Sequence, residues 1–171
     1  MNKTNNIFSL TCAGLLTALS FLAMMGANII PTGRIALICV AAAIQCVIIL
    51  EVGRVLGTAS SAALAILILL FGTNKYLSAA YVLYFAAYPV LKSVFETNKS
   101  KKKEYIYKGA YFFITSIIGA AAAYIMFKMP IIITFLGALA IMLVGDYALS
   151  LFISFYMVRI YPYTKRINKK H

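Results

Sequence analysis

Asp146 is a carboxylate at a position in the sequence where ionisable side chains are rare. It lies near the middle of a long apolar run, in the tripeptide Gly145-Asp146-Tyr147. A carboxylate at such a depth in a bilayer is costly unless it is paired or faces a cavity, and intramembrane ionisable residues are often functional. Two interpretations stay open from the sequence. Asp146 either contacts a ligand or joins two helices through a hydrogen bond to a Tyr or Gln.

The other deep polar groups and the aromatic residues of the chain also allow two interpretations. Asn28 and Gln45 are each more typical of a hydrogen bond that fastens neighbouring helices. An aromatic set is spaced i, i+3, i+4 and i+7 and therefore shares one helical face. It comprises Tyr81, Tyr84, Phe85 and Tyr88. Such a face could stack on a planar ligand, although aromatic faces more often pack against other helices. Pro89 follows directly and predicts a kink there.

The sequence lacks the residues that catalysis or metal binding would need. The single His is the last residue, and the cysteines at 12, 39 and 46 are scattered through apolar runs. There is no glycine-rich phosphate loop, zinc motif or nucleophile elbow. The acids number only four, at positions 51, 96, 104 and 146. We therefore predict no enzyme, no cofactor and no metal site.

The elements that would position these residues are membrane spans. Of 171 residues, 63% are hydrophobic and 12% are charged, whereas a soluble domain is about half apolar and a quarter charged. The apolar runs cover about residues 7–30, 35–52, 56–71, 76–95, 107–127 and 131–160. The first is too long for a typical signal-peptide core. We predict an all-α polytopic membrane protein, with residues 1–171 forming one six-helix transmembrane domain.

The net charge of +12 predicts the topology of the chain. The basic residues lie between and after the apolar runs, which is typical of cytoplasmic retention and not of nucleic-acid binding. With the N-terminus inside, thirteen Lys and Arg residues fall on inner segments, and three fall on outer ends: Arg34, Lys75 and Lys128. The positive-inside rule thus predicts that both termini are cytoplasmic.

Small residues recur at a four-residue spacing in the first, third and fifth spans. The pairs are Gly14 with Ala18, Ala59 with Ala63, and Gly119 with Ala123. This spacing lets helix backbones approach closely. It indicates packing inside the bundle, which we favour for the fifth span, or a docking surface for another membrane subunit.

The chain resembles the substrate-binding S components of energy-coupling factor transporters, in their uncharacterised S-component-like branch. The resemblance is diffuse and covers the whole chain. It rests on the opening residues 13–20 (AGLLTALS), the segment Tyr88-Pro89-Val-Leu-Lys92, and the closing residues 146–149 (DYAL) and 156–162 (YMVRIYP). It implies a bacterial plasma-membrane subunit that binds a vitamin-like micronutrient for import and is powered by ATPase subunits on other chains. It also implies that Gly14, Ala18, Ala59 and Ala63 contact a transmembrane coupling subunit.

The substrate site is expected in an outward-opening cavity walled by the last three spans, with residues 28–34 and 73–75 as its lid. The predicted contacts to the small molecule are Asn28, Arg34, Asn74, Lys75, Tyr81, Tyr84, Tyr88, Lys128 and Asp146. Such a site would have mostly apolar walls and a few convergent polar groups. The alternative function is a non-transport membrane scaffold or cell-envelope morphogenesis protein, with the same tight packing and no outward pocket.

Overall fold

The computed structural model describes residues 3–95, 101–128 and 130–161, and these ranges fold into helices and short connections. The elements are α1 (Lys3–Ile29), α2 (Arg34–Val52), α3 (Arg54–Phe71), α4 (Lys75–Tyr81), η1 (Val82–Ala86), α5 (Tyr88–Phe95), α6 (Lys101–Phe127) and α7 (Ile131–Arg159). Six stretches are long and apolar enough to cross a membrane, with α4, η1 and α5 together making the fourth. The prediction of an all-α protein with six membrane-spanning helices is therefore confirmed.

Most helix ends lie within a few residues of the predicted bounds, and the polar segment before the fifth span is the exception. We predicted a loop up to about residue 106, but α6 begins at Lys101. Lysine and glutamate are good helix formers, so a helix can continue beyond its apolar part. The remaining loop positions, 96–100, lie outside the described residues.

The turn between α2 and α3 is short because a single residue, Gly53, makes it. Gly53 has φ of 98°, a conformation that glycine adopts readily and other residues avoid. Its N–H donates to the Ile49 carbonyl at 3.2 Å and so closes α2. The two helices consequently run back along each other almost without a connection.

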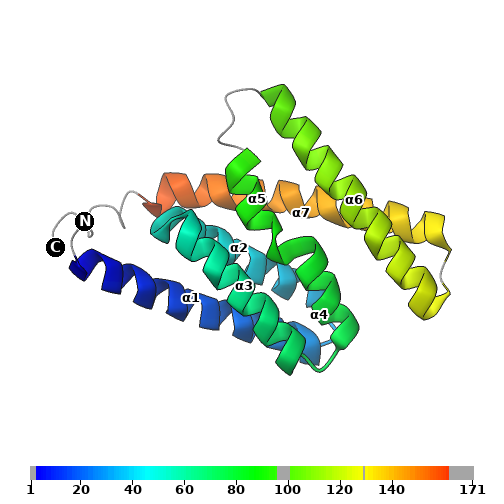
Figure 1. Cartoon of the computed structure of the whole chain (residues 1–171), viewed down its shortest axis with the longest axis horizontal. Coiled ribbons are helices and arrows are strands. Elements are labelled where there is room, and N and C mark those ends of the chain that lie inside the picture. Colours follow the sequence, from blue (N-terminus) through cyan, green and yellow to red (C-terminus); the bar gives the residue numbers. More distant parts are fainter. Residues whose placement is uncertain (1–2, 96–100, 129, 162–171) are drawn as a thin grey trace.

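The helices form two groups that meet along α2 and α7. In the first group α1, α2 and α3 pack against one another, and in the second α6 and α7 form a hairpin. The fourth span lies between the groups and contacts both. Figure 1 shows the start of α1 and the end of α7 at the same end of the bundle, together with the α2–α3 turn. An even number of spans produces this arrangement.

The exposed surface is apolar, as a bilayer environment demands. Large aliphatic side chains point outward on α6 and α7, among them Ile125, Ile132 and Val144, each more than two thirds exposed. The interior is also mostly apolar, but it includes polar side chains such as Gln45, Ser116 and Lys92. Lys is almost never fully buried in proteins unless it is paired.

The fourth span is broken, as Pro89 predicts. Between α4 and α5 the backbone forms the π-helical turn η1, and Pro89 falls in the first turn of α5, where its missing N–H is harmless. The π-helical turn disturbs the regular hydrogen bonding of the helix, and the Leu83 carbonyl accepts a hydrogen bond from the Tyr111 hydroxyl of α6 at 3.2 Å. A side chain of a neighbouring helix thus satisfies backbone that the break leaves irregular.

Candidate functional site

A cluster of charged and hydroxyl side chains connects the last three spans. Asp146 Oδ1 accepts hydrogen bonds from Lys92 Nζ and from the Tyr88 hydroxyl, each at 2.5 Å. Lys92 Nζ also donates to Ser150 Oγ at 2.6 Å, and Lys108 Nζ lies 3.9 Å from Asp146 Oδ2. We call Tyr88, Lys92, Lys108, Asp146 and Ser150 the charge cluster.

Helical spacing brings these five residues together. Tyr88 and Lys92 are four residues apart on α5, and Asp146 and Ser150 are four apart on α7, so each pair shares one face of its helix. The third contribution, Lys108, comes from α6. One acceptor on α7 is therefore approached by donors from both neighbouring spans.

Aromatic packing holds the α5 side of the cluster in place. The Tyr88 ring lies 5.7 Å from the Tyr111 ring and 5.4 Å from the Phe112 ring, measured between centroids, and both of these residues are on α6. The Lys92 ammonium lies 5.8 Å from the centroid of the Tyr88 ring. An ammonium at this distance is within reach of the attraction of an aromatic face for cations.

The burial of Lys92 makes the ion pair necessary. Its side chain is 1% exposed, against 22% for Asp146. A buried ammonium without a partner would be strongly destabilising, because the bilayer interior does not solvate charge. The cluster can therefore hold two spans together, and it can also present an anion-binding ammonium or a carboxylate acceptor to a polar ligand. The described residues contain no group of three or more His, Cys, Asp or Glu that could hold a metal ion.

Two predicted site residues, Tyr88 and Asp146, lie together in this cluster. Their hydrogen bond is the Tyr-to-Asp helix contact that we expected as one of two interpretations of Asp146. The other predicted tyrosines pack against protein: Tyr81 is 1% exposed and stacks on Phe85, and Tyr84 is half-buried with its hydroxyl beside Gly119. In this structure the aromatic face of the fourth span is used mostly for packing.

The predicted lid residues form a separate group at the other end of the fourth span. Asn28 Oδ1 accepts a hydrogen bond from the Asn74 backbone N–H at 2.9 Å, which joins the two predicted lid segments. Asn74 Oδ1 in turn accepts from the Leu77 N–H at 3.1 Å and so caps α4. Lys75 Nζ donates to the carbonyls of residues 69 and 70 at the end of α3. These bonds are the kind that fix helix ends.

The remaining two predicted cations lie in the connections between helices. Arg34 is the first residue of α2, and Lys128 is exposed between α6 and α7 with φ of 52°. No hydrogen bond or ion pair of Arg34 or Lys128 with the charge cluster is found among the described residues. The nine predicted contacts are thus divided among the cluster, the core of the fourth span and the helix ends.

The four small residues predicted to contact a coupling subunit all lie on the outside of the bundle. Gly14 and Ala18 on α1, and Ala59 and Ala63 on α3, are exposed. A Cβ added to Gly14 would meet no other atom within 4 Å. The packing inside the first group uses other small residues, which are Ala13, Ala27, Ala41, Ala42, Gly57, Ser60 and Ser61.

Gln45 has the packing role that the sequence suggested. It is fully buried, and its Oε1 accepts hydrogen bonds from Ser60 Oγ at 2.7 Å and Ser61 Oγ at 3.1 Å. These bonds tie α2 to α3 in the first group. Together with Asn28, which links the connections at its end of the molecule, Gln45 shows that the deep neutral polar groups fasten helices.

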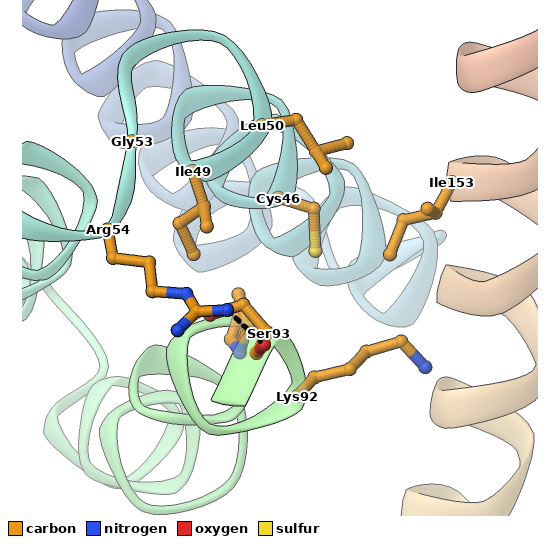
Figure 2. Close-up of a pocket in the computed structure, with 9 residues that line it drawn as sticks. Cys46, Ile49, Leu50, Gly53, Arg54, Lys92, Ser93 and Ile153 are labelled. Carbon is orange, nitrogen blue, oxygen red and sulfur yellow. Dashed lines mark hydrogen bonds between the residues drawn. The ribbon is translucent and has the colours of Figure 1, made fainter. Parts of the chain in front are cut away.

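Two cavities lie beside the fourth span. One, of about 400 Å³, is bounded by the α2–α3 turn, α5 and α7, and Figure 2 shows Arg54, Lys92 and Ser93 at its edge. The other, of about 370 Å³, is an apolar groove between α3 and the η1–α5 segment. None of the nine predicted substrate contacts lines either cavity.

Sequence reasoning missed the lysine partners of Asp146. Lys92 and Lys108 lie near the ends of apolar runs, where lysine normally marks a cytoplasmic loop, so both were counted as topological charges. The usable signal was spacing: Tyr88-x-x-x-Lys92 and Asp146-x-x-x-Ser150 each place two polar groups on one helical face. That signal identifies a polar face and not its partner.

Comparison with protein-family models, with curated proteins and with solved structures gives no match for this chain.

Proposed function

We propose that this chain is the substrate-binding membrane subunit of an importer for a vitamin-like micronutrient, powered by ATPase subunits on separate chains. In this proposal it lies in the bacterial plasma membrane with both termini in the cytoplasm. One observation carries the proposal: the small residues at positions 14, 18, 59 and 63 are exposed, while neighbouring small residues fill the bundle. Such a surface permits close approach by a helix of another membrane subunit.

The charge cluster supports a substrate role for the last three spans. A polar ligand could take the place of Tyr88 as donor to Asp146, and an anionic ligand could compete with Asp146 for Lys92. Intramembrane ionisable groups often mark substrate pathways. The aromatic surroundings, with Tyr111 and Phe112 against Tyr88, match the mostly apolar walls of small-molecule sites.

The alternative, a membrane scaffold or cell-envelope morphogenesis protein, is favoured by a different observation. Asn28, Asn74 and Lys75 make hydrogen bonds that close helix ends, and the two cavities lie away from them. A scaffold would use the same exposed small residues to bind structural proteins. The identity of the bound partner therefore separates the two functions.

Co-purification from cross-linked native membranes tests the proposal. The tagged chain should retain a polytopic membrane subunit and ATPase subunits, identified by protein mass spectrometry. Ala18→Leu and Ala59→Leu should each reduce this retention at least tenfold, because a larger side chain prevents close backbone approach. The matched control is Ala122→Leu, an exposed alanine on α6. Thermal unfolding should be unchanged in all three variants.

Two results would count against the importer. Full retention of the ATPases by Ala18→Leu and Ala59→Leu would remove the docking role from this surface. Retention of cell-envelope proteins without any ATPase would favour the scaffold.

A further inference from the structure

We propose that the cavity of about 400 Å³ beside the α2–α3 turn binds the phosphate group of an anionic membrane lipid, with Arg54 as its principal contact. This inference goes beyond the import function, because the cavity lies at the α2–α3 turn, at the opposite end of α2 and α3 from Asn28 and Asn74.

The walls of the cavity are amphipathic. Ile49 and Leu50 of α2 and Ile153 of α7 supply an apolar side, and Arg54 of α3 and Ser93 of α5 supply a polar side (Figure 2). A volume of this size lies in the range of ligand pockets, which run from about 300 to 1,000 Å³. Walls of two kinds suit a molecule that carries both a polar head and a hydrocarbon part.

Arg54 is the group best placed to recognise the head. Its Nη2 donates to the Ser93 carbonyl at 3.0 Å, which directs the guanidinium toward the cavity edge between α3 and α5. A guanidinium has five N–H donors in a fixed planar arrangement and binds phosphate in a bidentate manner. The Lys92 side chain runs along the same cavity with its ammonium directed toward α7 and Asp146.

The surroundings of Arg54 favour a lipid as the source of the phosphate. The next residue, Val55, is 82% exposed, so exposed apolar surface begins one residue after Arg54 in α3. Arg54 is the first residue of α3, and in the predicted topology the α2–α3 turn is a cytoplasmic segment. Anionic lipids of the cytoplasmic leaflet collect at basic regions.

Native mass spectrometry of the full chain in mild detergent tests this site. Phosphatidylglycerol and phosphatidylcholine are titrated separately, and the bound lipid per chain is measured. The wild-type chain should retain phosphatidylglycerol preferentially. Arg54→Gln should weaken this binding about tenfold or more, since hydrogen bonds to charged groups are the strong ones. Lys128→Gln removes an exposed cation between α6 and α7 and should leave the binding unchanged.

A second variant separates the site from the fold. Ile153→Phe keeps Arg54 and fills part of the cavity, so it should also lose phosphatidylglycerol. Equal binding of both lipids, or full binding by Arg54→Gln, would overturn the proposal. Displacement of phosphatidylglycerol by inorganic phosphate, with loss of phosphate binding in Arg54→Gln, would overturn the lipid source and assign the site to a free phosphate.

Discussion

Two regions of the molecule are held together by different physical means: the first group of helices, α1–α3, and a second group in which α5 of the fourth span joins the α6–α7 hairpin. In α1, α2 and α3, small side chains allow close contact, and neutral bonds such as those from Ser60 and Ser61 to Gln45 fasten it. In α5, α6 and α7, one carboxylate, Asp146, gathers donors from two other spans. The first group relies on many small contacts, while the second depends on a few strong ones.

Because of this difference, we expect the first group to be rigid and the second group to be able to rearrange. Close backbone packing tolerates little rearrangement, because interiors are densely filled. An ion pair can be rearranged when a competing charge or a hydrogen-bonding ligand enters. The docking surface that we propose lies on the first group, and the candidate ligand groups lie on the second. In our proposal, attachment to a partner and recognition of a ligand therefore use different groups of helices.

The largest effect is expected at Asp146. Asp146→Asn leaves the Lys92 ammonium buried without its counter-charge, and breaking a buried ion pair by removing one partner costs about 3–5 kcal/mol. The free energy of unfolding, measured by denaturant titration in detergent, should fall by that amount. The double variant Asp146→Asn with Lys92→Gln should recover part of the loss, since no buried charge then lacks a partner. An additive double variant would show that the pair is not coupled.

A smaller effect is expected in the first group. Gly57→Ala places a Cβ 2.5 Å from Ile49 Cγ1 and 3.3 Å from Ile49 Cα, so α3 must move away from α2. Overpacking of this kind costs about 1–3 kcal/mol. The same unfolding assay measures it. A loss larger than that of Asp146→Asn would contradict the proposed division between the two groups.

The smallest effect is expected on the outside of the same group. A Cβ on Gly14 would meet no atom within 4 Å, so Gly14→Ala should change the free energy of unfolding by less than about 0.5 kcal/mol. Gly14 and Gly57 thus form a matched pair, one exposed and one buried. Destabilisation by Gly14→Ala comparable to that of Gly57→Ala would mean that Gly14 packs inside the bundle.

The spans could be predicted from the sequence because the bilayer imposes a simple requirement. A helix that crosses it needs about 20 apolar residues, and this sequence shows six such runs. The helical extension back to Lys101 escaped prediction, since hydropathy reports where lipid begins and not where a helix ends. The kink near Pro89 was expected from its missing N–H. Its form, a π-helical turn, was not, and the Leu83 carbonyl within that turn accepts a hydrogen bond from Tyr111 of α6, which the sequence does not place beside it.

The candidate site was less predictable for a physical reason. Asp146 could be singled out, because a carboxylate within an apolar run is anomalous on its own. Its partner Lys92 is 54 residues earlier, and only the packing of α5 against α7 brings the two together. Lysine near a span end has an ordinary topological explanation. Because of that explanation, Lys92 was not recognised as a buried residue, although its side chain is 1% exposed.

The π-helical turn η1 changes the direction in which the side chains beyond it point from the fourth span. One residue added to an α-helix rotates everything beyond it by about 100°. Tyr81 and Tyr88 lie on either side of the turn, and Tyr88 contacts α6 and Asp146. Such turns occur frequently at functional sites. The turn could move along the span by exchanging one backbone hydrogen bond at a time, and each residue that it passed would rotate about the helix axis. If it passed Lys92, the Lys92 side chain would point in a new direction without unfolding of the helix.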